Sequence, residues 1–122
     1  PEVAEILWQE GSLAPGAPSP LVFDNSVFVL SRPNVLNRAD AATGESQWKL
    51  RLSGNFSSTP VAASGHLFCF NEDGTAFVVD PSESGRIVST REFGETILAT
   101  PAVAGGALYI RSDGHLWKIT AP

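Results

Sequence analysis

The sequence is short of cysteine, methionine and positive charge. Cys69 is the only cysteine among 122 residues, which excludes an intramolecular disulfide and a zinc site built on several thiolates. Methionine is absent. The 8 Lys and Arg residues are scattered and outnumbered by 13 Asp and Glu residues, giving a net charge of −5. Phosphate backbones are bound by grouped basic side chains, so we expect no nucleic-acid partner.

Long apolar runs and catalytic loops are also missing. The longest uncharged stretch, residues 52–71, contains Pro60, His66, two glycines and four serines, so it cannot form a transmembrane helix. Glu2, Glu5 and Glu10 stand where a signal peptide would have its basic start and apolar core. Neither a nucleotide-binding glycine loop nor a G-x-S-x-G elbow occurs. We therefore expect no catalytic residues, no metal site and no bound cofactor.

A repeat of about 40 residues fills the chain. Trp8 and Trp48 lie 40 apart, and so do Asp40 and Asp80. The phrase Thr-Pro-Val-Ala-Ala-Ser-Gly at 59–65 returns as Thr-Pro-Ala-Val-Ala-Gly-Gly at 100–106. Such a period indicates a solenoid, propeller or array. We expect one domain over residues 1–122, with repeats at approximately 1–40, 41–81 and 82–122.

Each repeat divides into four short strands. In the middle copy these are residues 58–63, 66–70, 75–79 and 86–92, with Asp73-Gly74 as a hairpin turn. The first strand has small residues, the next two are apolar and the fourth is charged. This order predicts an all-β fold of β-propeller blades, three four-stranded antiparallel repeats that form a partial propeller. Residues 2–10 are good helix formers, but the repeat register places Trp8 at the start of an outer strand, and we follow the register.

The segment from Asp40 to Trp48 fits the pattern D-x-x-T-G-x-x-x-W. This resembles the tryptophan-docking repeat of PQQ-like β-propellers, a family that includes quinoprotein alcohol dehydrogenases and the assembly lipoprotein BamB. The resemblance implies that the glycine makes a tight turn, that the Trp packs between blades and that the protein is periplasmic or otherwise extracytoplasmic. The second copy departs from the pattern, with one extra residue and Ser89 at the Trp position. The expected structural motif residues are Asp40, Thr43, Gly44, Trp48, Trp8, Asp80 and Gly85.

The resemblance implies a non-catalytic binding or scaffold module, the C-terminal part of a propeller that mediates protein–protein interaction in cell-envelope assembly. The alternative is a fragment of a PQQ-dependent quinoprotein dehydrogenase, whose family members bind PQQ with calcium and often carry a disulfide between adjacent cysteines. Strand order places the links between blades on one face with the turns between second and third strands. The partner-binding candidates on that face are Arg51, Asn55, Phe56, Glu72, Asp73 and Asp113, with Arg32, Asn34 and Glu95 beside them. The Phe56 ring is either an exposed contact or a wedge between blades.

Three blades are too few for a closed ring, because propellers have four to eight. Two open blade faces are expected, and such faces are apolar patches. One hypothesis is that the chain is part of a larger propeller, whose remaining blades are its partner. The other is a homodimer in which two copies pair head-to-tail into a six-bladed ring, each lending its N-terminal strand to the other.

Overall fold

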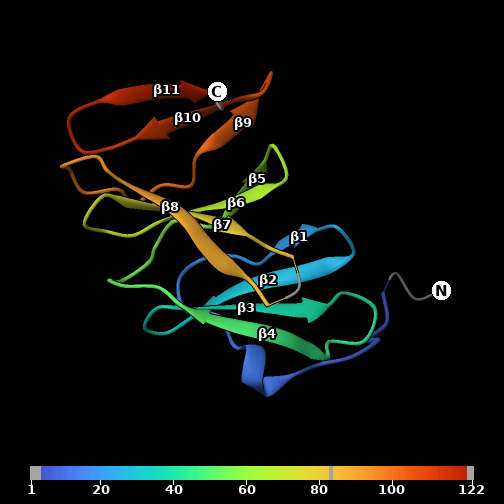
Figure 1. Cartoon of the computed structure of the whole chain (residues 1–122). Helices are drawn as coiled ribbons and strands as arrows, with labels where there is room; N and C mark the ends of the chain where they lie inside the picture. Colours follow the sequence, from blue (N-terminus) through green and yellow to red (C-terminus); the bar gives the residue numbers. More distant parts are fainter. Residues whose placement is uncertain (1–3, 83, 121–122) are drawn as a thin grey trace.

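The computed structural model describes residues 4–82 and 84–120, so the outer repeat limits at residues 1 and 122, and Glu83 in the second docking turn, lie outside the described residues (Figure 1). These ranges contain eleven strands and one short 3-10 helix, joined by turns and loops. The elements are η1 (Gly11–Leu13), β1 (Leu21–Phe23), β2 (Ser26–Ser31), β3 (Val35–Asp40), β4 (Ser46–Arg51), β5 (Val61–Ala63), β6 (His66–Phe70), β7 (Thr75–Asp80), β8 (Arg86–Glu92), β9 (Ala102–Ala104), β10 (Ala107–Arg111) and β11 (Leu116–Thr120).

The strands form three separate antiparallel sheets. Their orders are β1-β2-β3-β4, β5-β6-β7-β8 and β9-β10-β11, so each sheet is a meander of sequence neighbours. The innermost strands are three residues long and the outermost strand β8 is exposed along its whole length. The predicted fold class, all-β with propeller blades, is therefore confirmed. Within the middle blade the predicted limits of the second and fourth strands are those observed, whereas β5 begins after Pro60, which has no N–H to donate to a ladder.

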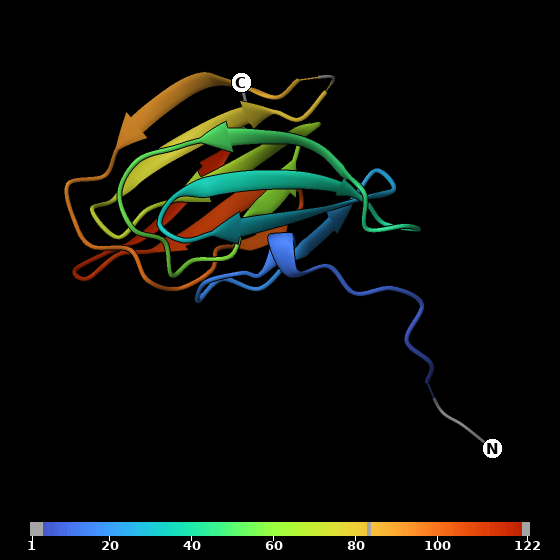
Figure 2. The ribbon, with the colours of Figure 1, turned by 90° about the horizontal axis from the view of Figure 1, so that it is seen from below.

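The N-terminal segment differs from its prediction. Residues 4–10 form no strand, so the expected outer strand at Trp8 is wrong, and they form no helix either. A strand is held by backbone hydrogen bonds to a neighbour. Of the described strands, none lies beside this segment, which runs away from the sheets before η1 (Figure 2). The segment nevertheless keeps the side-chain contact of its repeat position, as described below.

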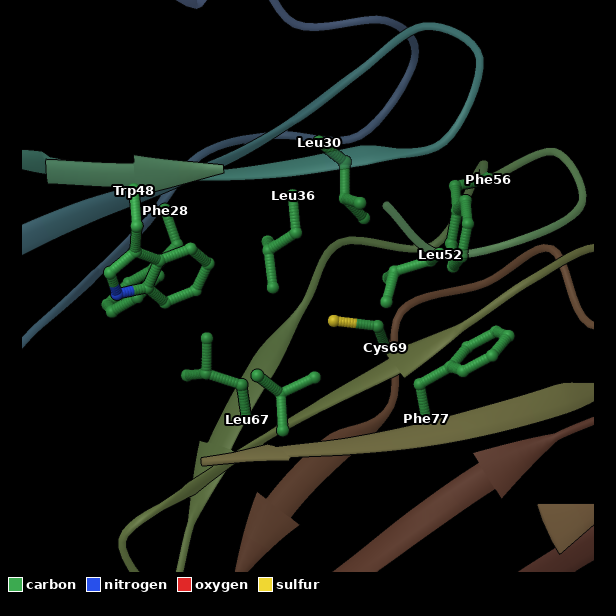
Figure 3. Close-up of a cluster of buried hydrophobic side chains, with 10 residues drawn as sticks. Phe28, Leu30, Leu36, Trp48, Leu52, Phe56, Leu67, Cys69 and Phe77 are labelled. Carbon is green, nitrogen blue, oxygen red and sulfur yellow. The ribbon is translucent and has the colours of Figure 1, made fainter. Parts of the chain in front are cut away.

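Apolar side chains fill the spaces between neighbouring sheets. Between the first and second sheets lie Phe28, Leu30, Leu36 and Trp48 on one side and Leu67, Cys69 and Phe77 on the other (Figure 3). A second cluster, built on Phe70, Phe93, Leu108 and Ile110, joins the second sheet to the third. Complete burial of Cys69 raises the pKa of its thiol to about 12, as expected for an inert core cysteine.

A ladder of hydroxyl groups joins the starts of the three inner strands. The Ser19 N–H donates to Thr59 Oγ1, and the Thr59 N–H donates to Thr100 Oγ1, each over 2.9 Å. Each of these residues precedes a proline that opens its blade. The ladder therefore sets the spacing of the blades with the same bond in each step.

Candidate partner-binding face

One face of the molecule is built from two kinds of loop: the links that lead into each blade, and the turns between the second and third strands. Backbone hydrogen bonds tie each link to a turn. The Glu72 N–H donates to the Asn55 carbonyl over 2.8 Å, and the Asp113 N–H donates to the Thr96 carbonyl over 3.0 Å. These bonds lie 41 residues apart in the sequence, so the two blades repeat one construction. The face is consequently a set of loops held on a rigid scaffold, as binding surfaces often are.

At the junction of the first and second blades this face has a hollow of about 330 Å³. Arg32 and Glu72 both line it, and the Ser57 hydroxyl donates to Glu72 Oε2 over 2.6 Å. The hollow therefore offers one cation and one hydrogen-bonded carboxylate. Its lining residues are Ala17, Arg32, Pro33, Asn55, Phe56, Ser57 and Glu72.

At the junction of the second and third blades the same face carries a polar cluster around Glu95. Its carboxylate accepts hydrogen bonds from the Ser112 hydroxyl and from the Gly114 N–H, and lies 2.9 Å from Nδ1 of His115. The Ser112 hydroxyl, the Gly114 N–H and His115 together lower the pKa of Glu95, Ser112 contributing most. The cluster continues inward, because Trp117 Nε1 donates to Ser112 Oγ over 2.9 Å.

Most of the partner-binding candidates are accessible on this face. Arg51, Asn55, Asp73 and Asp113 are exposed, whereas Glu72 is half-buried. Arg51 donates to Asn34 Oδ1 over 3.4 Å. Phe56 is different: it is 7% exposed and its ring lies 6.1 Å from that of Phe77. Its side chain is thus packed between the blades, where it forms part of the wall of the hollow.

Sequence reasoning did not single out Ser57, Ser112 or His115. A signal existed for Ser112, because Asn71 occupies the matching place 41 residues earlier. Asn71 is 2% exposed and its side chain bonds the link carbonyl of Ser53, so a polar link-to-turn contact recurs there. Nothing in the sequence marks Ser57 or His115 in this way.

The opposite face carries the tryptophan contacts. Trp48 Nε1 donates to the Pro81 carbonyl of the next blade over 3.1 Å, and a Cβ on Gly85 would lie 2.7 Å from Trp48 Cε2. Trp8 makes the same two contacts with a turn of the first blade. Its Nε1 donates to the Ala41 carbonyl over 3.0 Å, and its ring covers Gly44. Each indole therefore lies on the turn of the following blade.

Aspartates shape the two turns that receive the indoles. Asp40 Oδ1 accepts from the N–H groups of Ala42 and Thr43 over 2.8 and 3.1 Å. Asp80 Oδ1 accepts from the N–H and hydroxyl of Ser82, and these bonds lower the pKa of Asp80. The Thr43 hydroxyl in turn accepts from the Glu45 N–H over 3.2 Å.

The indole of Trp48 thus joins the first sheet to the second, and Trp8 makes the same kind of contact 40 residues earlier. The family model of the outer membrane protein assembly factor BamB matches residues 3–88. The chain belongs to the BamB family of PQQ-like β-propellers. Comparison with curated protein sequences finds no match.

Solved structures show the same BamB-like architecture. BamB from Moraxella catarrhalis is 20% identical, with a TM-score of 0.72 over 85% of this chain and 33% of that one. A quinohemoprotein alcohol dehydrogenase from Pseudomonas putida HK5 is 19% identical, with a TM-score of 0.66 over 78% of this chain and 16% of that one. The computationally designed Ika8 protein is 13% identical, with a TM-score of 0.68 over 84% of this chain and 32% of its own. At these identities the likeness concerns the fold.

The chain spans about a third of the length of the Moraxella catarrhalis BamB chain that it matches. Among residues 4–82 and 84–120, no helix has the length and apolar character needed to cross a membrane. The same residues contain no group of three or more His, Cys, Asp and Glu side chains placed to hold a metal ion.

Proposed function

We propose that this chain is a non-catalytic protein-binding module of an extracytoplasmic BamB-like propeller, acting in cell-envelope assembly. The single observation that carries the proposal is the loop face, where links and turns are cross-bonded into a rigid surface of mixed charge. Asp73 and Asp113 lie exposed on matching turns of two neighbouring blades, and Arg51 is exposed at the end of β4. Rigid loops with accessible polar side chains bind a partner at little cost in ordering.

The family match supports the location and the kind of partner that we propose. The family model describes an assembly factor of the outer membrane, and the matched structure bears the name BamB. An envelope protein is therefore the partner that we propose for the loop face. The remaining blades of a longer propeller, or a second copy of this chain, would occupy the open blade faces and not the loops.

Photo-crosslinking from chosen positions tests this assignment. The full chain, carrying a benzophenone amino acid at position 73 or 113, is expressed in bacterial cells that have an outer membrane. It should then form adducts with an envelope protein. The matched control places the same group at Thr43, which is exposed on the opposite face. Equal adducts from both faces, or none from the loop face, would contradict the proposal.

The alternative, a portion of a quinoprotein dehydrogenase, is favoured only by the fold similarity to a quinohemoprotein alcohol dehydrogenase. The residues do not fit its cofactor as the family resemblance describes it. A single buried Cys69 cannot form a disulfide between adjacent cysteines, and within the described ranges no acidic cluster offers calcium its oxygen ligands. We expect no change in melting temperature with PQQ and calcium together, and a clear rise would favour the dehydrogenase.

A further inference from the structure

A cleft of about 620 Å³ lies between the second and third sheets, away from the loop face described above. Small-molecule sites are typically clefts of about 300 to 1,000 Å³ with mostly apolar walls and a few polar groups. The lining of this cleft is mainly apolar, with some polar side chains. Its lining residues are Ala63, Ser64, His66, Phe68, Ala76, Val78, Ser89, Thr90, Arg91, Phe93, Gly106, Leu108, Ile119 and Thr120.

The cleft exists because three side chains that fill the preceding interface are replaced by small ones. Strand pairing fixes the matching positions, since Arg38 faces Trp48 in the first sheet as Val78 faces Ser89 in the second. In the first sheet the three matching side chains are Phe23, Leu36 and Trp48, which pack in the core between the first and second sheets. The matched pairs are Phe23 with Ala63, Leu36 with Ala76, and Trp48 with Ser89.

An indole fills the matching place one blade earlier, so a flat aromatic ring is the natural shape to occupy this cleft. Apolar side chains line the cleft from both sheets. Phe68 of the second sheet and Ile119 of the third are half-buried, and Leu108 of the third is buried. Aromatic rings packed against such walls gain from both burial and ring–ring contact.

The one cation in the described lining of the cleft, Arg91, points to an anion. Its lining includes Arg91 and His66 but no aspartate or glutamate, although the chain as a whole carries a net charge of −5. Among the described residues Arg91 forms no ion pair and is exposed on β8. His66 is held at the rim by the contact of Nδ1 with the Ser64 carbonyl at 2.9 Å. Guanidinium groups bind carboxylates in a two-pronged, charge-assisted manner.

We propose that this cleft binds a small planar aromatic carboxylate, with the ring in the space left by Ala76 and Ser89 and the carboxylate at Arg91. The site does not depend on the protein-binding role of the loop face. The ligand binds reversibly, and no covalent bond is made or broken.

Indole-3-acetate is a suitable probe, because it pairs the missing indole with a carboxylate. Titration of the full, isotope-labelled chain should shift backbone amide resonances of β8, β10 and β11 and leave those of β2 unchanged. Ser89→Trp, which restores the residue of the preceding blade, should abolish these shifts. Ala76→Leu fills the same space by a smaller change and should weaken binding as well, so one of the two variants is informative if the other fails to fold.

Arg91→Gln tests the anion site. It should weaken indole-3-acetate binding about tenfold, as for one lost charge-assisted hydrogen bond, and leave the binding of neutral indole unchanged. Arg86→Gln is the matched control, because Arg86 lies on the same strand, outside the cleft, 3.9 Å from Asp80. Absence of shifts in the wild-type chain at millimolar probe, or equal binding by folded Ser89→Trp, would overturn the site. Equal losses with Arg86→Gln and Arg91→Gln would overturn the role of Arg91.

Discussion

Glycine at position 85 shows how much one hydrogen atom contributes to blade packing. Gly85 has a φ of +68°, and the Trp48 indole lies where its Cβ would be. Gly65 has a similar φ of +74° but nothing within 4 Å of that place. The two positions share the backbone requirement and differ in the contact, so they form a matched pair.

Gly65→Ala should lower the free energy of unfolding by about 1 kcal/mol, the strain of a left-handed backbone. Gly85→Ala should cost about 1 to 3 kcal/mol more, because a buried indole must also move. Urea unfolding followed by tryptophan fluorescence measures both. Equal losses would show that the indole does not depend on this turn.

The carboxylate of Glu95 makes stability depend on pH. Its hydrogen bonds hold its folded-state pKa below that of an unfolded glutamate, about 4.3. The stabilisation is therefore complete above that value and is lost as the pH falls through the folded-state pKa. The difference in free energy of unfolding between wild type and Glu95→Gln should shrink from pH 7 toward about pH 3. Glu5→Gln, at an exposed position outside every strand, should show a flat difference; a flat difference for Glu95→Gln as well would contradict this assignment.

At the scale of elements, the inner and outer strands of one blade should differ in their opening. β6 is hydrogen-bonded on both edges and contributes buried Leu67, Cys69 and Phe70, whereas β8 is the exposed outer strand. Amides of β6 should therefore exchange with deuterium at least about tenfold more slowly than those of β8. Mass spectrometry of peptides from the two strands measures the rates, and β2 and β4 provide the same comparison in the first blade. Similar rates in β6 and β8 would mean that the blade opens as one unit.

The elements also show what the sequence could predict. Glycine-containing turns and a 40-residue period were enough to place the blades, because local turn geometry and strand pairing between neighbours determine a meander. The repeat register could not predict whether the segment around Trp8 forms a strand. A strand needs a neighbour to pair with, and the register does not say whether one is present. Likewise, the sequence could not decide whether the Phe56 ring is exposed or wedged between blades, because that depends on the position of Phe77. The cleft at Ser89 required the pairing registers of two sheets at once, which a linear pattern does not contain.

At the scale of the whole molecule, we propose that the two ends of one chain pair with those of a second copy. Within the described residues, β11 has one edge without a neighbouring strand, and exposed Leu116 lies on it at 77% exposure. The segment before η1 carries Glu5 and Glu10, and the third sheet carries Arg111 and Lys118. An acidic segment without a strand partner and an open edge with basic neighbours favour head-to-tail pairing of two copies.

We expect light scattering after size exclusion to give a mass near twice 12.9 kDa at high protein concentration, falling on dilution. Leu116→Lys should shift the equilibrium toward the monomer by placing a charge on the open edge. Val22→Lys, at a similarly exposed apolar position on β1, is the control for added charge alone. A monomer at every concentration would overturn the paired ring, and masses that keep growing would show open, heterologous chains instead.

The hydroxyl ladder through Ser19, Thr59 and Thr100 gives the molecule a direction. Every step donates from one repeat to the next, so the first repeat presents a hydroxyl acceptor and the last presents a backbone donor. Any blade added at either end can continue the series only if it arrives in the same orientation. Blade number can therefore change by whole repeats, through duplication or deletion of a Thr-Pro unit, without altering the type of bond in this ladder.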